Sequence, residues 1–292
     1  MREPGLYRGI PNAEYHRGLI TVEDGHGRSL KPLSSTGAKT LLTESPADYL
    51  WKLEHPVSKK AYDAGHAAHE LILEGRFSEV RELKGYTDPK TGEYKRFENR
   101  MTSAAKEADK EIRGRGLTPM LTKELVPARG MASAVRKHPV ASNLLSEGEA
   151  EVSALVWDVE YQVWLQVRFD WLRGSLLLDL KTDTTANPRD FSTKIGRYKY
   201  HLQASLYLRA AELLGIESPE FAWLVVQNTG RHAISVISYS QSDRLIGDRL
   251  MHQALSTYAQ CMRSGEWPGY DNIYLSALPK WAEYEAEDLE ND

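Results

Sequence analysis

The sequence predicts one α/β domain built around a mixed β-sheet. Apolar residues follow a helical spacing in the first and last thirds of the 292-residue chain, whereas the middle alternates with a period of two. A helix and two further strand-like segments follow that middle region, an order typical of a sheet covered by helices. We therefore expect a single domain over residues 1–282, with a mainly helical part at 1–145 and a sheet core with a C-terminal helix at 146–282.

The first part of the chain carries several helix signals. A helical pattern follows the serine-containing segment 33–36, and Pro46 opens a second helix that runs to about Leu53. Two longer helices are predicted at Ala61–Glu74 and Thr122–His138, which a glycine and a proline end. Residues 84–94 are rich in turn-forming residues and predict a mobile loop.

The second part carries the strand signals. Glu151–Val159 and Tyr161–Leu172 alternate and are dense in β-branched and aromatic residues, and a short strand follows at Leu176–Lys181. Beyond a helix at Lys199–Leu214, Phe221–Gln227 and His232–Tyr239 form a predicted hairpin across an Asn-Thr-Gly turn. A last helix is expected at about 242–263.

Composition excludes several classes of protein. The single cysteine excludes an internal disulfide, a four-cysteine zinc site and a cysteine-bound iron–sulfur cluster. No apolar run is long enough to cross a membrane and no secretory leader is evident, so we expect a cytoplasmic protein without membrane contact. The nucleotide-binding pattern Gly-x4-Gly-Lys-Ser/Thr is absent, so no bound nucleotide is expected.

The net charge of −4 is unevenly distributed. Residues 283–292 hold six acidic and no basic side chains, which leaves +2 for residues 1–282. We expect the acidic tail to be disordered and solvated. The main part of the chain is therefore compatible with a negatively charged partner such as DNA.

Two strands of the predicted sheet carry charged residues together. If Arg173-Gly174 is the turn between them, Arg168 lies opposite Asp179 and Asp170 opposite Leu177. One face of the pair is then charged and the other apolar; the charged set is Arg168, Asp170, Asp179 and Lys181, and the apolar set is Phe169, Leu178 and Leu180.

Two carboxylates that share a site repel each other unless a cation lies between them. Asp170 and Asp179 therefore predict a divalent metal site, for which Mg²⁺ is suited because it needs few protein ligands. Lys181 would orient a water molecule or stabilise charge during phosphodiester hydrolysis. The alternative is a solvated sheet edge, where an Asp-x-Lys pattern is also common.

Polar residues on two helices fit the same site. Gln203 and Tyr207 are four residues apart and share one helix face, although polar residues at a helix rim would look the same. His69 follows the small residues of Ala64-Gly65-His66-Ala67-Ala68, which permit close approach of helix and sheet. Imidazole binds Mn²⁺ well, but an ordinary core or surface histidine is the alternative.

The ordered set of these motifs resembles the PD-(D/E)xK nuclease superfamily in its RecB-like form. The set is Gly65-x3-His69, Asp170, Asp179-x-Lys181 and Gln203-x3-Tyr207. Within that group the chain is similar to the RecE-type exonucleases, including exodeoxyribonuclease VIII and phage exonucleases. Further similar segments span about residues 10–282 and include Tyr15-His16, Ser45-Pro46-Ala47-Asp48-Tyr49 and Trp267-Pro268-Gly269-Tyr270. The resemblance implies a restriction-endonuclease-like core with an N-terminal helical elaboration.

The resemblance also implies roles for individual residues. His69, Asp170 and Asp179 would bind the metal together with the Leu180 backbone carbonyl. Lys181 would position or activate the attacking water, while Gln203 and Tyr207 would organise the site and contact DNA or the lysine. Glu151 would hold a second metal through water, or else be a solvated strand end.

Basic residues near this site are candidate DNA contacts. Arg168 would form a salt bridge or contact a phosphate. A cluster of four basic residues adjoins the site and favours contact with the DNA backbone: Arg189, Lys194, Arg197 and Lys199. Ser35 and Lys39 lie at a helix start that could bind a 5′ phosphate, with ordinary helix capping as the alternative.

The function that the resemblance implies is a Mg²⁺-dependent deoxyribonuclease, with Mn²⁺ as a substitute. It would act as a 5′→3′ exonuclease on double-stranded DNA ends in phage-type recombination, in the cytoplasm of a bacterial or phage-infected cell. A ring-shaped homo-oligomer and a single-strand annealing protein as partner are implied as well. The alternatives are an endonuclease or single-strand-specific nuclease of the same superfamily, and a non-catalytic DNA-binding or assembly module.

Overall fold

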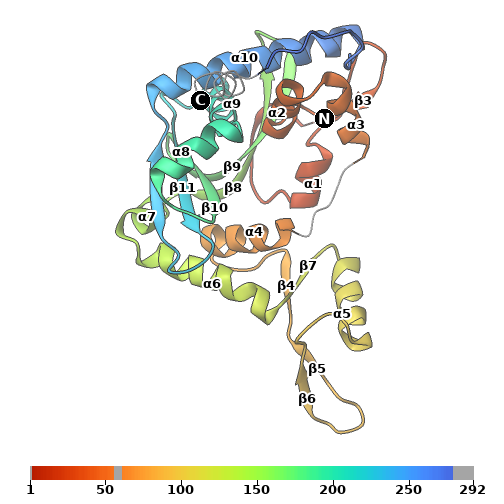
Figure 1. Cartoon of the computed structure of the whole chain (residues 1–292), viewed down its shortest axis with the longest axis vertical. Helices are drawn as coiled ribbons and strands as arrows, with labels where there is room; N and C mark the ends of the chain where they lie inside the picture. The colour runs from red at the N-terminus through yellow and green to blue at the C-terminus, as the bar shows by residue number, and fades with distance from the viewer. Residues whose placement is uncertain (1, 56–60, 279–292) are drawn as a thin grey trace, which may run out of the picture.

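A six-stranded mixed sheet forms the centre of the computed structural model, which describes residues 2–55 and 61–278 (Figure 1). In order across the sheet the strands are β1 (Gly5–Tyr7), β8 (Glu149–Asp158), β9 (Val163–Arg173), β10 (Leu176–Asp183), β11 (Glu220–Gln227) and β12 (Ile234–Ser238). Neighbouring strands are antiparallel except β10 and β11, which are parallel. The predicted α/β fold around a mixed sheet is confirmed, as is the β11–β12 hairpin.

The parallel pair of strands, β10 and β11, determines the position of the helix that carries Gln203 and Tyr207. Parallel neighbours need a crossover connection, which here consists of α8 (Pro188–Arg197) and α9 (Tyr200–Leu213). The sequence predicted α9 but not α8. Lys199 joins the two helices with a left-handed backbone (φ 54°), so α9 starts in a new direction. The crossover therefore returns along the sheet and brings α9 against the strands.

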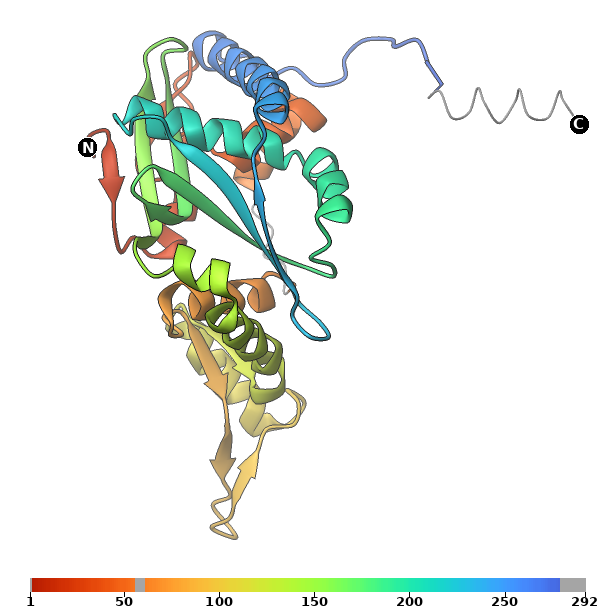
Figure 2. The ribbon, with the colours of Figure 1, turned by 90° about the vertical axis from the view of Figure 1, so that its left-hand side faces the viewer.

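Helices cover both faces of the sheet (Figure 2). One face packs against α2 (Ser35–Thr43), α3 (Pro46–Glu54), α9 and α10 (Gln241–Ser264). The opposite face packs against α4 (Ala61–His69), its continuation η1 (Glu70–Glu74), α6 (Thr122–Lys137) and α7 (Pro139–Leu144). Within the described part of the chain, no helix combines the length and apolar character that crossing a membrane requires.

The predicted N-terminal helices are confirmed together with their start and stop signals. Ser34 caps α2 by accepting a hydrogen bond from the Gly37 N–H, and Ser45 forms a capping box with Asp48 at the start of α3. The helix predicted at 61–74 changes from α- to π-type at Glu70 before it ends. Such a π-helical turn is rare and is often found at functional sites.

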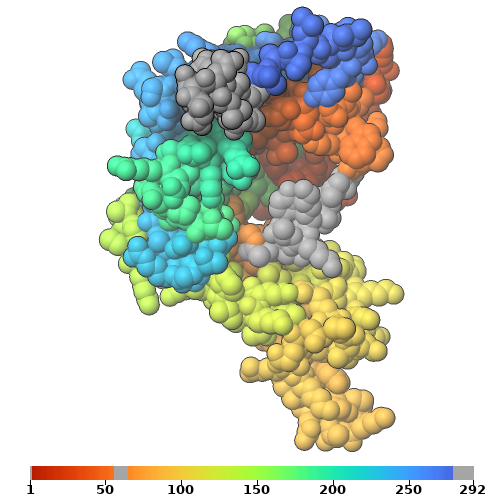
Figure 3. Space-filling model, viewed as in Figure 1, coloured from red at the N-terminus to blue at the C-terminus, as the bar shows by residue number. Residues whose placement is uncertain are grey.

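A projecting arm replaces the mobile loop expected at residues 84–94. Its elements are β4 (Val80–Leu83), β5 (Gly85–Thr87), β6 (Tyr94–Arg96), α5 (Ser103–Gly114) and β7 (Thr118–Leu121). The strands β5 and β6 form an antiparallel hairpin that extends away from the main body (Figures 1 and 3). Gly85 permits the pairing, because a Cβ there would lie 2.2 Å from the Lys95 carbonyl oxygen. The expected loop is therefore limited to residues 88–93, which connect the two strands of the hairpin.

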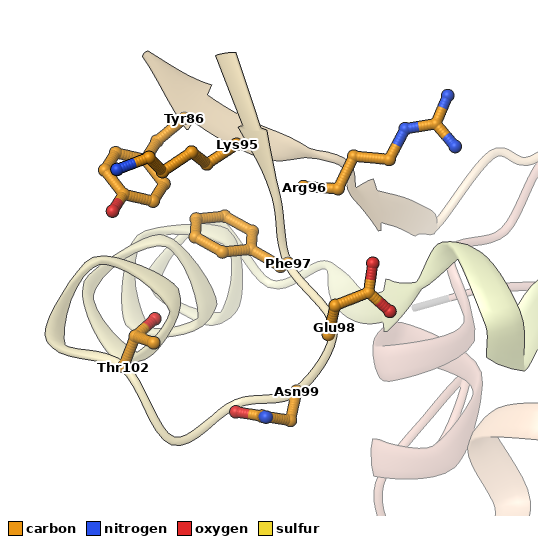
Figure 4. A pocket seen from close by; sticks show the side chains of 7 residues that line it. All are labelled: Tyr86, Lys95, Arg96, Phe97, Glu98, Asn99 and Thr102. Atoms are coloured by element: carbon orange, nitrogen blue, oxygen red, sulfur yellow. The ribbon is translucent and has the colours of Figure 1, made fainter. Parts of the chain in front are cut away.

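The arm has a small core of its own. Leu83, Phe97 and Leu121 are buried together, and the Tyr86 ring stacks on Phe97 at 5.5 Å. A cavity of about 240 Å³ lies between the hairpin and the start of α5, with Phe97 and Thr102 in its lining (Figure 4). None of the residues that line it belongs to the site predicted from the sequence.

The N-terminal segment is joined to the sheet by a buried amide. It comprises β1, α1 (Asn12–Arg17), β2 (Val22–Glu23) and β3 (Ser29–Leu30). Gln166 on β9 accepts a hydrogen bond from the Leu19 N–H at 2.6 Å and donates one to the Tyr15 carbonyl at 2.7 Å. The segment is thereby held beside the charged part of β9. The predicted acidic tail, 283–292, lies outside the described residues.

Asp24 connects this segment to the end of α10. Its buried carboxylate accepts hydrogen bonds from the Trp267 indole at 2.9 Å and from Arg28 Nε at 2.9 Å, and from two backbone N–H groups. Burial opposes ionisation, but these hydrogen bonds outweigh it and lower the pKa of Asp24 to about 2. Asp24 is therefore a charged structural link between two ends of the chain.

We expect Asp24→Asn to lower the free energy of unfolding at pH 7 by about 2 kcal/mol, because the amide cannot replace all four accepted bonds. The folded-state pKa is depressed, so this contribution is present above pH 4 and is lost as the pH falls towards 2. Urea unfolding of both proteins between pH 2 and 7 measures the difference. Glu107→Gln, which removes an exposed carboxylate from α5, serves as control, and an Asp24→Asn effect independent of pH would contradict the assignment.

Candidate metal centre

The strand pairing around β9 is interrupted at Asp170. Trp171 pairs with Ala150 and Phe169 pairs with Val152, whereas no pairing joins Asp170 to Glu151 between them. On its other side, β9 pairs with β10 only from Arg173 to Trp171. Glu151 has a left-handed backbone with φ 52°, which costs free energy for a residue other than glycine and recurs at functional sites.

The predicted register of β9 and β10 was wrong. Leu177 lies opposite Leu172 rather than Asp170, so continuing the pairing places Asp179 beside Asp170 and not beside Arg168. The shift arises because the two-residue turn lies one residue later than assumed, at Gly174-Ser175, so that Leu176 pairs directly with Arg173. The shift brings the two aspartates closer in register than the sequence suggested.

The predicted division of the strand faces was also wrong. Phe169 packs in the core beneath α9, whereas Leu178 and Leu180 pack in the opposite core beneath α4 and α6. Asp179 and Lys181 point towards α9, as their contacts with Gln203 and Tyr200 show. The cause is the interruption at Asp170, where β9 stops alternating regularly relative to β10.

Three residues from different elements bring metal-binding atoms together at this interruption. His69 ends α4, Glu151 lies in β8 and Asp170 in β9, and one donor atom from each lies within 4.8 Å of the others. The Nδ1 atom of His69 is 3.9 Å from Glu151 Oε1 and 3.7 Å from Asp170 Oδ2. The structure thus unites His69 and Asp170 as predicted, and places Glu151 directly with them.

In this cluster the carboxylates outnumber the groups that could carry positive charge, and the pKa values reflect this. Burial raises the pKa of Asp170 to about 7, and the carboxylates of Asp179 and Glu151 act in the same direction. For His69, burial favours the neutral form, but Asp170 and Glu151 outweigh it and raise the pKa. Asp170 Oδ2 also accepts a hydrogen bond from the Leu180 N–H at 2.7 Å.

Asp179 and Lys181 form a second, adjoining group. Asp179 is only 1% exposed, and its Oδ1 accepts a hydrogen bond from the Gln203 amide at 2.7 Å. Its Oδ2 forms an ion pair with the Lys181 ammonium but receives no hydrogen bond of regular geometry from the described residues. Burial lowers the pKa of Lys181, but Asp179 and Asp170 outweigh it, so the net shift is upward.

These residues fit a hard divalent metal ion. The donor set comprises carboxylate oxygens and one imidazole nitrogen, and such sets suit Mg²⁺ or Mn²⁺ rather than a soft metal. The incompletely bonded Oδ2 of buried Asp179 and the raised pKa of Asp170 are both expected where a cation completes the site. For Leu180 the structure shows the N–H contact to Asp170, and its carbonyl as a metal ligand stays a prediction.

Tyr207 lies in the core beneath the site. Its ring makes edge contacts with Phe169 and Phe221, and a hydrogen bond links it to buried Ser35. Burial raises the pKa of Tyr207 well above its ordinary value, so the phenol stays neutral. The structure therefore gives Tyr207 and Ser35 a packing role, and their proposed contacts with DNA stay predictions.

Arg168 is directed inward. The side chain is largely buried, donates to Ser153 Oγ and to the Ile10 carbonyl at 2.9 Å each, and stacks over the Tyr15 ring at 4.2 Å. Its guanidinium lies 3.8 Å from Glu151, so the salt bridge expected with Asp179 is formed with Glu151 instead. A phosphate contact by Arg168 is still a prediction.

The predicted basic cluster is on and beside α8. Arg189 and Arg197 are exposed, whereas Lys194 forms an ion pair with Asp183 and Lys199 makes the bend into α9. This arrangement leaves two freely exposed arginines close in sequence to the strand that carries Lys181.

Two further residues complete the surroundings of Lys181. Tyr200 lies one turn before Gln203 on α9, and its ring is 5.0 Å from the Lys181 ammonium. Lys39 comes from α2, and its ammonium donates to Gln203 Oε1 at 2.9 Å. The helical spacing of Tyr200 and Gln203 is a signal that could have identified the tyrosine, whereas nothing local in the sequence connects Lys39 to this site.

A second cluster of His66, Glu70 and Glu79 lies beside the first. His66 Nε2 is 2.8 Å from Glu70 Oε1, and Glu70 also accepts hydrogen bonds from the backbone N–H groups of Ser78, Glu79 and Val80. The Glu70 carboxylate is thus saturated by the protein. This cluster fixes the π-helical turn after His69 to β4 and needs no metal.

Comparisons with known proteins agree with this fold. A crystal structure of a "putative exonuclease" from Eubacterium rectale aligns with a TM-score of 0.54 and 12% identity, over 86% of this chain and 92% of that one. A crystal structure of the protein SSO0001 aligns over 67% of this chain and 84% of that one, with 15% identity. Its TM-score of 0.27 is too low to indicate a common fold. A search among curated proteins found no match.

The first likeness supports the fold alone, because so few residues are identical. The model of one protein family, the PDDEXK-like domain of unknown function (DUF3799), matches residues 34–274 and so includes every residue of the metal centre. The chain therefore belongs to this PDDEXK-like family, and its central sheet is the PD-(D/E)xK core.

Proposed function

We propose that the protein is a Mg²⁺-dependent deoxyribonuclease that hydrolyses phosphodiester bonds. One observation carries the proposal: the cluster of His69, Glu151 and Asp170 adjoins the ion pair of buried Asp179 with Lys181 at the centre of a PD-(D/E)xK sheet. Members of this superfamily generally use divalent metal ions, and the donor set suits such an ion. A metal ion that activates water, with a lysine beside it that stabilises developing charge, can carry out phosphodiester hydrolysis.

The carboxylates of Asp170, Asp179 and Glu151 would hold Mg²⁺ together with His69. Mg²⁺ bound there supplies positive charge to a phosphodiester oxygen and lowers the pKa of a water molecule. The protein's own contribution is to keep these ligands in place: the Leu180 N–H orients Asp170 and the Gln203 amide orients Asp179. The left-handed backbone of Glu151 likewise belongs to the arrangement that places its carboxylate beside His69 and Asp170.

Lys181 acts as a cation in this proposal. Its pKa is raised, because the two aspartates outweigh burial, so the ammonium form prevails in the metal-free protein. An ammonium group can donate a hydrogen bond to the attacking water and can stabilise charge on the pentavalent phosphorus. We therefore assign Lys181 to orientation and charge stabilisation rather than to proton removal.

The preferred substrate is a double-stranded DNA end, degraded 5′→3′ in phage-type recombination. The RecE-type motifs support this choice, and the E. rectale protein of similar fold is described as a putative exonuclease. A ring-shaped homo-oligomer, a single-strand annealing partner and a cytoplasmic location belong to the same proposal. An endonuclease of the superfamily is the second candidate, since the metal centre itself does not discriminate between DNA ends and interior sites.

Purified protein with Mg²⁺ or Mn²⁺ should degrade linear duplex DNA and spare closed circles. Asp179→Asn and Lys181→Met should each reduce the rate by about 100-fold or more, because each removes charge at the reacting phosphate. A duplex labelled at one 5′ end, with and without a 5′ phosphate, reports the polarity. The carboxylate control is Asp88→Asn in the hairpin, which should retain full activity.

Two results would contradict parts of this proposal. Linear DNA left intact by the wild type and by Asp179→Asn alike would exclude the nuclease. Cleavage of closed circles at the same rate as linear DNA would replace the exonuclease by the endonuclease.

Metal affinity should increase with pH. Asp170, whose pKa is about 7, and His69 must both release protons before they bind a cation. Asp170 alone should strengthen Mg²⁺ or Mn²⁺ binding about tenfold between pH 6 and pH 8. Calorimetric titration in buffers of different ionisation enthalpy measures both the affinity and the protons released. Equal affinities at pH 6 and pH 8 would show that Asp170 is not a ligand, and Asp88→Asn should behave as the wild type.

A further inference from the structure

Among the described residues, Lys39 is a cation of the centre that has no carboxylate partner. Its ammonium, half-buried on α2, has two contacts in the described part of the chain: Gln203 Oε1 at 2.9 Å and the Tyr200 ring at 5.0 Å. Lys181 lies over the same ring at the same distance, but it is paired with Asp179. Two ammonium groups thus share one aromatic ring, and only one of them is neutralised.

The partner of Lys39 is a neutral amide. Gln203 accepts from Lys39 through Oε1 and donates to Asp179 through Nε2 at 2.7 Å, so these two neighbours fix which way the amide points. An amide oxygen keeps an ammonium in position, but it does not balance the charge. Lys39 is therefore held towards the reaction centre with its charge uncompensated.

The surroundings of Lys39 favour an incoming anion. Burial and the nearby charge of Lys181 lower the pKa of Lys39 to about 8, while Asp179 acts in the opposite direction. A cation bound by the neighbouring carboxylates would increase the positive charge further. A ligand that carries negatively charged oxygens would relieve this excess and restore the full charge of Lys39.

We infer that Lys39 binds a non-bridging phosphate oxygen of the DNA strand that enters the centre, and that Gln203 holds the ammonium in place until then. This inference rests on the proposed nuclease function and names the side chain that contacts the substrate. It differs from phosphate binding at the start of α2, where Ser34 already caps the helix and Ser35 is buried against Tyr207.

The test measures DNA binding without metal, so that no cleavage interferes. A labelled duplex is titrated in EDTA across a series of salt concentrations with the wild type, Lys39→Met, Lys39→Gln and Lys39→Arg. Each phosphate contact contributes about 0.9 to the slope of log affinity against log salt for duplex DNA. The two neutral variants should therefore bind about 5- to 10-fold more weakly and lose about one unit of slope.

Matched variants separate phosphate binding from a merely structural role. Lys39→Arg keeps the charge and should restore the salt slope, even if its different shape disturbs Gln203. Lys106→Met removes an exposed lysine from α5 of the arm and should leave the slope unchanged. Thermal unfolding of each variant confirms that the proteins compared are folded.

The outcomes distinguish this inference from the function on which it rests. If the wild type binds and cuts DNA while both neutral variants keep its affinity and salt slope, Lys39 does not bind phosphate and the nuclease proposal stands. If the wild type neither binds nor cuts DNA, both proposals are wrong. A lost unit of slope in both neutral variants, restored by arginine, supports the phosphate contact.

Discussion

Two neighbouring aspartates, the partly buried Asp170 on β9 and the buried Asp179 on β10, are the constraint on which the rest of the site depends. Asp170 and Asp179 belong to neighbouring strands, and burial in low dielectric makes their mutual repulsion costly. Several groups offset this repulsion. Asp179 forms an ion pair with Lys181 and accepts a hydrogen bond from Gln203. Asp170 lies beside the His69 imidazole and accepts a hydrogen bond from the Leu180 N–H. Leu180 and Lys181 directly follow Asp179, but His69 and Gln203 come from distant parts of the sequence, so the fold must be complete before the aspartates are accommodated.

The surrounding elements serve this arrangement in different ways. The crossover between β10 and β11 is obligatory for parallel strands, and it places α9 where Gln203 and Tyr200 reach Asp179 and Lys181. On the opposite face, small residues at Ala67 and Ala68 let α4 pack closely enough for His69 to reach Asp170. Polar side chains therefore reach the two aspartates from helices on both faces of the sheet.

Much of this could be predicted from the sequence, because helix caps and strand alternation are local signals. Helices α2, α3, α4, α6, α9 and α10 and strands β8 to β12 followed from such signals, and the proximity of His69 to Asp170 followed from the set of motifs. The register of β9 and β10 did not follow, because it depends on which two residues form the turn, and moving the turn by one residue changes every pair. The left-handed backbone of Glu151 has no signal in its residue type, since glutamate rarely adopts that conformation.

The least predictable parts arise from contacts between distant segments. Lys39 enters the centre because α2 packs between α9 and α10, and no pattern within α2 indicates this position. The β5–β6 hairpin could not be predicted for another reason. Its turn residues are also typical of a loop, and only the strand pairing and the small core distinguish the hairpin from a loop.

The separation of the ligands along the chain also links metal binding to folding. His69, Glu151, Asp170 and Asp179 span more than a hundred residues, so an unfolded chain offers no comparable site. The metal-free folded protein keeps these groups together only with a raised pKa at Asp170 and a strained backbone at Glu151. A cation would relieve both the repulsion and the need for protonation, and at 100 times its dissociation constant it would stabilise the fold by about 2.7 kcal/mol. The centre is thus arranged for a charge that the polypeptide itself does not supply.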